Sequence, residues 1–337
     1  MSGRPEGHEP RFPALTVDWP PDVTTVTFAQ FGVQADDAER AIAERDRLID
    51  LMRGDHGPVI VDRGTFTEVD GQPTAVALAY WLDPETYDRW WSQAEVRRAW
   101  TDLPDDGPVG YWREVAQIPR TRIETLHTHP GTDYPTTGLS QLLPVEITET
   151  HDYWGAARDR IPASVTDALT GELVGMPGTE LVGRGGRVAV TPPDNLCLIR
   201  TAQDWSQSSA FRAAYVDDVK PVKDAGVQYL RDEPAASGCL AARNIDEQDA
   251  AGRPEDKTST VAWFGSLEDL LVWCRKHPTH LAIYGSFFKM VASQEAPLDV
   301  AFWHEISVLP AGSVEAEYVN CSTVTGLLRL SRPAATL

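Results

Sequence analysis

The stretches Gly110-Tyr-Trp-Arg-Glu-Val-Ala-Gln-Ile-Pro119 and Ala301-Phe-Trp-His-Glu-Ile-Ser-Val-Leu-Pro310 decide how this chain is organised. Both place an aromatic residue and a tryptophan before Arg-Glu or His-Glu, and both end in apolar residues and a proline. Runs of this composition that end at a proline are typical of β-strands. The recurrence of such a strand at two distant places predicts an internal repeat.

A second match precedes each of these strands. The first copy reads Trp81-Leu-Asp-Pro with Trp90 downstream, and the second reads Trp263-Phe-Gly-Ser with Trp273 downstream. In both, an apolar strand ends at the tryptophan and an Asp-Pro or Ser cap then begins a helix. Two matches in the same order favour a duplicated α+β unit over the alternative, in which aromatic strand starts recur by chance.

The surrounding elements suggest the fold of each half. Thr25 to Val33 is β-branched and aromatic, and Asp36 to Arg53 has the spacing of an amphipathic helix. The strand–helix–strand–strand order predicts an α+β fold of duplicated ferredoxin-like units, whose sheets pair into a barrel-like core. We divide the chain into an N-terminal arm (1–22), a first half (23–140), a bridging insertion (141–204) and a second half (205–337).

Composition excludes several classes of function. The 337 residues carry 30 Lys and Arg against 50 Asp and Glu, a net charge of −20 that disfavours binding to nucleic acid or to anionic membranes. The longest apolar run, Ala75 to Leu82, is too short to cross a bilayer, and Met1 to Pro13 lacks an apolar signal region. The four cysteines lie far apart, which favours a reduced cytoplasm over a disulfide framework.

The repeat differs at one position that carries chemistry. Arg113 in the first copy corresponds to His304 in the second, and a glutamate follows each. Because side chains alternate along a strand, His304 and Glu305 should point to opposite faces. His304 is either a histidine at the surface or core edge, or the sign that one half is specialised around an imidazole.

A second histidine, His280, follows the helix that carries Trp273. Pro278 ends or kinks that helix, and the apolar run Leu281-Ala-Ile-Tyr-Gly-Ser-Phe-Phe288 comes next. An imidazole beside such a wall costs free energy unless it finds a partner, so His280 is either a satisfied core histidine or a ligand. Zinc would need three or four clustered ligands, whereas a haem iron needs one axial imidazole and a large apolar pocket.

Several longer segments point to one known family by their order and spacing. They are His151-Asp-Tyr-Trp-Gly155 with Arg158-Asp-Arg-Ile-Pro162, Asp194-Asn-Leu-Cys-Leu-Ile-Arg-Thr-Ala-Gln-Asp-Trp205, His277-Pro-Thr-His-Leu281, Trp303-His-Glu-Ile-Ser-Val308, and Glu317-Tyr-Val-Asn-Cys321 with Thr325-Gly-Leu-Leu328. With these segments the chain resembles the haem-containing aldoxime dehydratases, phenylacetaldoxime and aliphatic aldoxime dehydratases, from roughly Phe28 to Arg329.

The resemblance implies a lyase that converts aldoximes, R–CH=N–OH, to nitriles with the substrate nitrogen on ferrous haem b. His280 then corresponds to the axial ligand of the haem iron, and His304 to a distal general acid and base. Arg160 falls on a distal arginine, Thr201 on a serine that hydrogen-bonds the substrate oxygen, and Glu124 on a glutamate that works with the distal histidine. The alternative is that these three residues have structural roles only: Arg160 as a solvated surface residue, Thr201 as an ordinary strand residue and Glu124 as an ion-pair partner. The resemblance also implies a homodimer.

Two residues depart from the family pattern. Thr201 keeps the hydroxyl of the expected serine but adds a methyl group and stiffens the side chain. Ser322 stands where the family has a histidine after Asn-Cys. The alternative functions are a haem peroxidase or chlorite-decomposing enzyme on a related α+β barrel, and a haem carrier or sensor.

Overall fold

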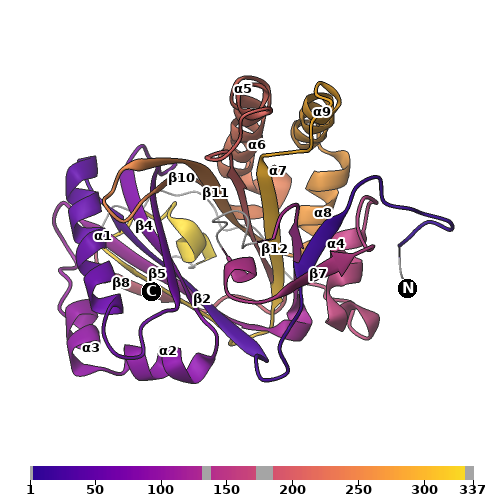
Figure 1. The fold of residues 1–337 in the computed structure, drawn as a ribbon. Coiled ribbons are helices and arrows are strands. Elements are labelled where there is room, and N and C mark those ends of the chain that lie inside the picture. Colours follow the sequence, from indigo (N-terminus) through magenta and orange to yellow (C-terminus); the bar gives the residue numbers. More distant parts are fainter. Residues whose placement is uncertain (1–2, 131–137, 172–184, 331–337) are drawn as a thin grey trace.

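Apolar strands build one long antiparallel sheet, and helices pack on its outer face. The computed structural model describes residues 3–130, 138–171 and 185–330. Within these ranges the strands pair in the order β7-β1-β6-β12-β9-β11-β10-β3-β4-β2-β5-β13-β8. Figure 1 shows α1, α2 and α3 gathered on one side of the molecule and α5 to α9 on the other. The α+β class expected from the sequence is confirmed.

The first half contributes four neighbouring strands in the order β3-β4-β2-β5. Its elements are β2 (Thr25–Gln34), α1 (Ala38–Met52), β3 (Ile60–Thr67), β4 (Pro73–Trp81), α2 (Pro84–Trp91), α3 (Ala94–Thr101) and β5 (Gly110–Pro119). Asp37 and Asp83 cap α1 and α2, because their carboxylates accept the backbone N–H of Arg40 and Thr86. The strands and helices predicted here from the sequence are confirmed.

The second half repeats that order as β10-β11-β9-β12. Its elements are β9 (Leu196–Asp204), α5 (Arg212–Ala214), a π-helical turn (Tyr215–Val219), α6 (Lys220–Asp232), α7 (Pro234–Ser237), β10 (Cys239–Gln248), β11 (Pro254–Phe264), α8 (Leu267–Lys276), α9 (Pro278–Ala292) and β12 (Ala301–Leu309). Ser266 caps α8 as expected, since its hydroxyl accepts the N–H of Asp269. Pro278 separates α8 from α9, which carries His280 in its first turn.

Each half gives a strand to the other half's sheet. β6 (Ile123–His127) follows β5 along the chain but pairs with β12, and β13 (Val314–Val319) follows β12 but pairs with β5. The outer strands are β1 (Ala14–Val17), β7 (Val145–Thr148) and β8 (Arg187–Val190). The short helices are α4 (Ala156–Arg160) and the 3₁₀ turns Arg120–Arg122, Leu139–Gln141, Pro162–Val165 and Gly326–Leu330.

Strand pairing tests the correspondence proposed between the two copies. Arg113 lies opposite Phe31, and His304 lies opposite Thr201, at the same place in the two strand orders. Counting from these pairs, Trp81 corresponds to Phe264 and not to Trp263. The expected match of Trp81 with Trp263 is therefore wrong by one residue.

The faces of the sheet explain this error. Trp81 packs with α1 and α2 on the outer face, whereas Trp263 is buried in the core between the halves. An aromatic residue is favoured on both faces of a buried strand, so the tryptophan itself does not fix the register.

Buried polar contacts join the halves on the inner face of the sheet. Tyr80 of the first half donates to Glu305 of the second at 2.6 Å. At the equivalent place, Trp263 of the second half donates its indole N–H to Glu114 of the first at 2.6 Å, and Arg243 binds both oxygens of Glu114. The two glutamates therefore hold the same place in the two copies and are bound across the same interface.

None of the helices in the described ranges is both long enough and apolar enough to cross a membrane.

Candidate active site

Three residues singled out in the sequence meet on one face of the second half. The Nε of Arg160 donates to Oε2 of Glu124 at 2.7 Å, and Nε2 of His304 lies 3.0 Å from Oε1 of Glu124. Nη2 of Arg160 lies 3.2 Å from the same His304 nitrogen. The Glu124 side chain is 0% exposed and that of Arg160 6%, whereas His304 is 28% exposed. The buried pair thus holds an imidazole that remains open to a ligand.

Strand register brings these residues together. β12 runs between β6 and β9, and His304 lies opposite Leu126 on one side and Thr201 on the other. Glu124 lies opposite Ile306, two residues along from His304, so all of these side chains share one face. Glu305 points to the other face, as expected.

The electrostatics of Glu124 keep it ionised. Burial alone would raise the pKa of this carboxyl, but Arg160 and His304 outweigh burial, and the net shift is downward. Arg160 is fixed by a second bond, from Nη1 to the carbonyl oxygen of Thr150 at 2.6 Å. Glu124 is therefore a counter-charge for a guanidinium and an imidazole together, and Arg160 is not the solvated residue of the structural alternative.

Thr201 lies beside His304, but its hydroxyl is already engaged. Its O–H donates to the backbone carbonyl of Trp303 at 2.7 Å, and the amide of Gln203 lies 3.4 Å from its oxygen. In this rotamer the oxygen can accept a hydrogen bond from a ligand, whereas donating to one would require the side chain to rotate.

His280 lies in the first turn of α9 between two indole rings. The ring of Trp273 is 4.7 Å away and that of Trp154 6.5 Å away, both edge to face. Burial, with a smaller contribution from His304, lowers the pKa of His280 to about 4, so the imidazole is neutral at pH 7 and keeps a free lone pair. Its Nδ1 is buried without a hydrogen-bond partner among the described residues.

The surface of α9 fits a large apolar group. Met290 is the one buried residue of this helix, all of which is described, although most of its residues are apolar. Leu281 is 41% exposed and Tyr284 38%, and a Cβ placed on Gly285 would meet nothing within 4 Å. A neutral histidine, an uncovered apolar wall and flanking indoles are the donor set and surroundings that haem requires.

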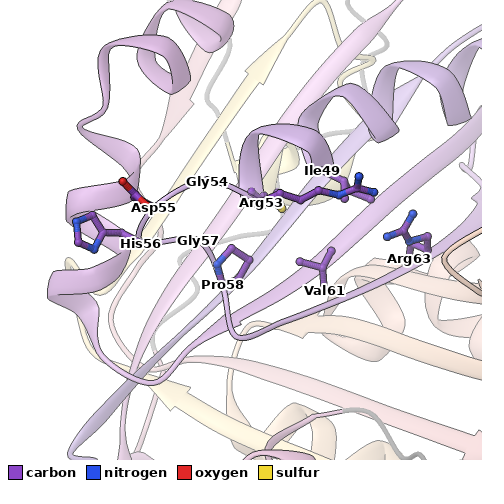
Figure 2. Close-up of a pocket in the computed structure, with 10 residues that line it drawn as sticks. Ile49, Arg53, Gly54, Asp55, His56, Gly57, Pro58, Val61 and Arg63 are labelled. Carbon is purple, nitrogen blue, oxygen red and sulfur yellow. The ribbon is translucent and has the colours of Figure 1, made fainter.

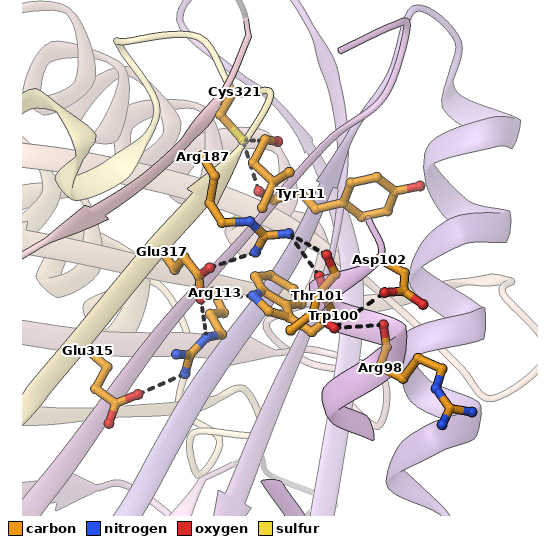
Figure 3. A network of polar contacts seen from close by, with 11 residues as sticks. Arg98, Trp100, Thr101, Asp102, Tyr111, Arg113, Arg187, Glu315, Glu317 and Cys321 are labelled. Atoms are coloured by element: carbon orange, nitrogen blue, oxygen red, sulfur yellow. Dashed lines mark hydrogen bonds and ion pairs between the residues drawn. The ribbon is translucent and has the colours of Figure 1, made fainter. Parts of the chain in front are cut away.

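The equivalent place in the first half is closed. Arg113 replaces the histidine and binds Glu315 at 2.9 Å, and Glu315 lies opposite Val115 just as Glu124 lies opposite Ile306. Figure 3 shows this pair continuing through Glu317 to Arg187 and Trp100. Trp91 stacks on the Arg113 guanidinium at 4.2 Å. Aromatic rings fill this half where the second half leaves α9 uncovered.

A surface hollow of about 560 Å³ lies at the loop between α1 and β3, in the first half. Figure 2 shows Arg53 and Arg63 at one end of it and Asp55 and His56 at the other. Because the acidic and basic groups do not converge, the hollow offers no acid–base pair. The candidate residues of the second half do not line it.

Some residues around the site were not predicted as functional. Trp154 and Trp273 flank His280, and no local signal separates them from core tryptophans. His127 on β6 is buried with both ring nitrogens unpartnered among the described residues, and burial lowers its pKa to about 3. Ser322 is buried in the loop after β13, where its carbonyl accepts the N–H of Thr325.

The sequence matches one protein family over most of its length. The family model of haem-containing dehydratases matches residues 29–327. The chain is 38% identical to phenylacetaldoxime dehydratase of Bacillus sp. (strain OxB-1), covering 97% of this chain and 94% of the relative. It is 33% identical to aliphatic aldoxime dehydratase of Pseudomonas chlororaphis, covering 96% and 93%.

Solved structures agree with these relatives. A crystal structure of an aldoxime dehydratase matches with a TM-score of 0.88 and 31% identity, covering 99% of this chain and 95% of that one. A crystal structure of an aldoxime dehydratase in complex with butyraldoxime matches with a TM-score of 0.88 and 28% identity, covering 98% and 92%.

Proposed function

The chain belongs to the haem-containing dehydratase family, and from that premise we propose that it is an aldoxime dehydratase with His280 as axial ligand and His304 as distal acid and base. The observation that carries the proposal is the exposed imidazole of His304 held by the buried Glu124–Arg160 pair. The overall reaction is R–CH=N–OH → R–C≡N + H₂O, which loses one proton from carbon and returns one proton to oxygen.

Haem b is the cofactor of the proposed reaction. His280 would hold its iron, and Leu281, Tyr284 and Trp154 offer apolar surface around that histidine. When bound in the ferrous state, haem would supply an electron-rich iron able to bind the oxime nitrogen and weaken the N–O bond. The neutral state of the His280 imidazole supports this role, because a protonated ring has no lone pair for a metal.

His304 moves the protons. Nε2 lies 3.0 Å from the Glu124 carboxylate and 3.2 Å from Nη2 of Arg160, so both protein partners are at Nε2 and Nδ1 is left to face the substrate. From Nδ1 the imidazolium donates a proton to the departing hydroxyl oxygen, which leaves as water. The neutral ring then accepts the proton from the oxime carbon, so His304 returns to its starting state. Glu124 stabilises the imidazolium with which this cycle starts and ends.

Arg160 and Thr201 orient the oxime. Glu124 and the Thr150 carbonyl fix the guanidinium, so its remaining N–H groups can donate to the oxime oxygen without a cost in side-chain entropy. The oxygen of Thr201 can accept the oxime O–H, because its own hydrogen is given to Trp303. Together these groups direct the leaving oxygen toward His304.

We also propose that the fold arose from duplicated ferredoxin-like units in a dimeric-α+β-barrel-like arrangement. The equal strand orders of the halves and the matched Glu114 and Glu305 contacts support this. The division into 1–22, 23–140, 141–204 and 205–337 remains our proposal, with β9 at the end of the bridge supplying the first strand of the second unit. A homodimer and a cytoplasmic location complete the proposal, the latter supported by four free cysteines.

The test compares His280→Ala with His304→Ala. His280→Ala should purify with little haem or with a shifted Soret band. His304→Ala should keep its haem and bind butyraldoxime at the iron, but its kcat should fall by about 10²-fold or more, the scale for loss of a general acid. Pyridine-haemochrome content and anaerobic nitrile production in dithionite, without peroxide, are the measurements. Haem loss in His304→Ala with retention in His280→Ala would reverse the assignment, and peroxide-dependent turnover would favour an oxidoreductase.

A further inference from the structure

The motif His151-Asp-Tyr-Trp-Gly155 takes no part in the proposed chemistry, yet its neighbourhood touches both sides of the site. Just before it, the Thr150 carbonyl accepts a hydrogen bond from Arg160. Within it, the ring of Trp154 lies 6.5 Å from that of His280 and 5.5 Å from that of Tyr284. The motif therefore connects the distal arginine with the helix that carries the axial ligand.

The segment Gly3–Phe12 crosses this motif. The backbone N–H of Gly3 donates to Asp159 at 2.8 Å, and the His8 imidazole binds the carbonyl of His151 at 2.9 Å. Figure 1 shows the start of the chain on the side of the molecule that carries α4 and α8. A segment with these contacts is anchored at several points along its length.

Arg11 makes the contact with α9. Its Nε donates to Oδ2 of Asp152 at 2.6 Å, its Nη2 binds the other oxygen of Asp152, and Nη2 also donates to the Tyr284 hydroxyl at 2.8 Å. Its guanidinium lies 4.3 Å from the centre of the Phe288 ring. Since His280, Tyr284 and Phe288 are spaced by four residues, Arg11 binds the helix face that carries the axial ligand.

Asp152 is built for this contact. Its side chain is 3% exposed, and its backbone has φ = 64°, a conformation that costs free energy for a residue other than glycine. Helix α9 packs on α6 and α8 and contributes Phe287, Met290 and Val291 to an apolar cluster. Arg11 adds a polar contact on the face that carries His280.

We propose that Gly3–Phe12 is a strap that positions α9, and that Arg11 is a positioning residue that acts on His280 through Tyr284. The proposal rests on the proposed function in taking His280 as the axial ligand. The strap fixes the orientation of the imidazole and slows its departure from the iron.

The experiment compares Arg11→Met and Asp152→Asn with Glu9→Gln, a control at an exposed residue of the same segment. We expect both test variants to show about 10-fold faster amide exchange over residues 278–288 in haem-free protein and about 10-fold faster haem transfer to apomyoglobin, the scale for a lost charge-assisted contact. The iron–imidazole stretching band of the ferrous protein should shift. Glu9→Gln should match the wild type, and Arg11→Lys should recover part of the effect.

The outcomes separate this proposal from the proposed function. Wild-type exchange and haem transfer in both Arg11→Met and Asp152→Asn would overturn the strap. Full haem retention with an unshifted Soret band in His280→Ala would overturn the axial assignment, while exchange in haem-free protein still decides whether the strap holds α9. The Arg11 side chain is 54% exposed, so its replacement leaves the core intact, and Asp152→Asn tests the same contact from the other side.

Discussion

Replacing Glu124 by glutamine tests whether one buried carboxylate organises the site. The change keeps the shape of the side chain but removes the charge that faces Arg160 and His304 at 2.7 Å and 3.0 Å. Arg160, with a 6% exposed side chain, would then lie buried without its counter-charge. Breaking a buried ion pair from one side costs about 3 to 5 kcal/mol, and the amide oxygen still accepts one hydrogen bond, so we expect about 3 kcal/mol.

The effect should appear in both stability and turnover. A loss of about 3 kcal/mol lowers the melting temperature by roughly 4 °C in a chain of this size. Without the carboxylate the imidazolium of His304 loses its stabilising partner, so kcat should fall by about 10-fold to 100-fold. Thermal unfolding followed by circular dichroism and anaerobic nitrile production measure the two effects on the same preparation.

Glu305→Gln is the matched control for Glu124→Gln. Glu305 is equally buried and adjacent to His304 in sequence, but it faces the opposite side, where Tyr80 and the N–H of Leu139 donate to it. Burial raises its pKa, so loss of its charge costs less than loss of the charge on Glu124. We expect kcat within about three-fold of wild type. The reasoning is refuted if Glu124→Gln unfolds and turns over like the wild type, or if Glu305→Gln is the more damaged enzyme.

Three further substitutions test single features of the structure. The kcat of Thr201→Ser should stay within about three-fold of wild type. That of Thr201→Val should fall about 10-fold, because no oxygen remains to accept a hydrogen bond from the oxime O–H. A fully active valine variant would show that Thr201 is a packing residue. His127 titrates at 6.5 when unfolded and at about 3 when folded, so stability falls with pH below 6.5, by about 2 kcal/mol at pH 5. His127→Phe should remove that loss in urea titrations, and an unchanged pH dependence would contradict it. Gly32→Ala should cost about 3 kcal/mol, because its Cβ would lie 2.0 Å from the Trp112 ring; a neutral result in the same titration would show that the ring moves freely.

The sequence predicted the helices and strands more reliably than the contacts between distant segments. Strand composition and helix caps act locally, so β2, α1 and α8 followed from nearby residues. The correspondence of Arg113 with His304 also agrees with strand pairing, because the two blocks share several residues in a row. The match of Trp81-Leu-Asp-Pro with Trp263-Phe-Gly-Ser shares only the tryptophan at its start, so neighbouring residues could not fix the register, and the match of Trp81 with Trp263 is wrong by one residue.

Local sequence does not predict contacts between distant segments, and only the family resemblance implied that Glu124 works with His304. Glu124 reaches His304 because β6 pairs with β12. The residues of β6 do not indicate which strand it will pair with. The pairing of Arg11 with Asp152 spans 141 residues and joins two segments without a regular pattern. Such contacts depend on the completed fold, and local propensity carries no information about them.

The exchange of β6 and β13 determines how this protein can be recombined with its relatives. A chimera joined near residue 140 takes Glu124 from one parent and His304 from the other, although the two side chains lie 3.0 Å apart. It also has to match two separate strand ladders, β6 with β12 and β13 with β5, at the same crossover. In each parent, selection has acted only on that parent's own β6 paired with its own β12, and its own β13 paired with its own β5. The two halves are consecutive in the sequence, but because each pairs a strand with the other, they have to be exchanged together.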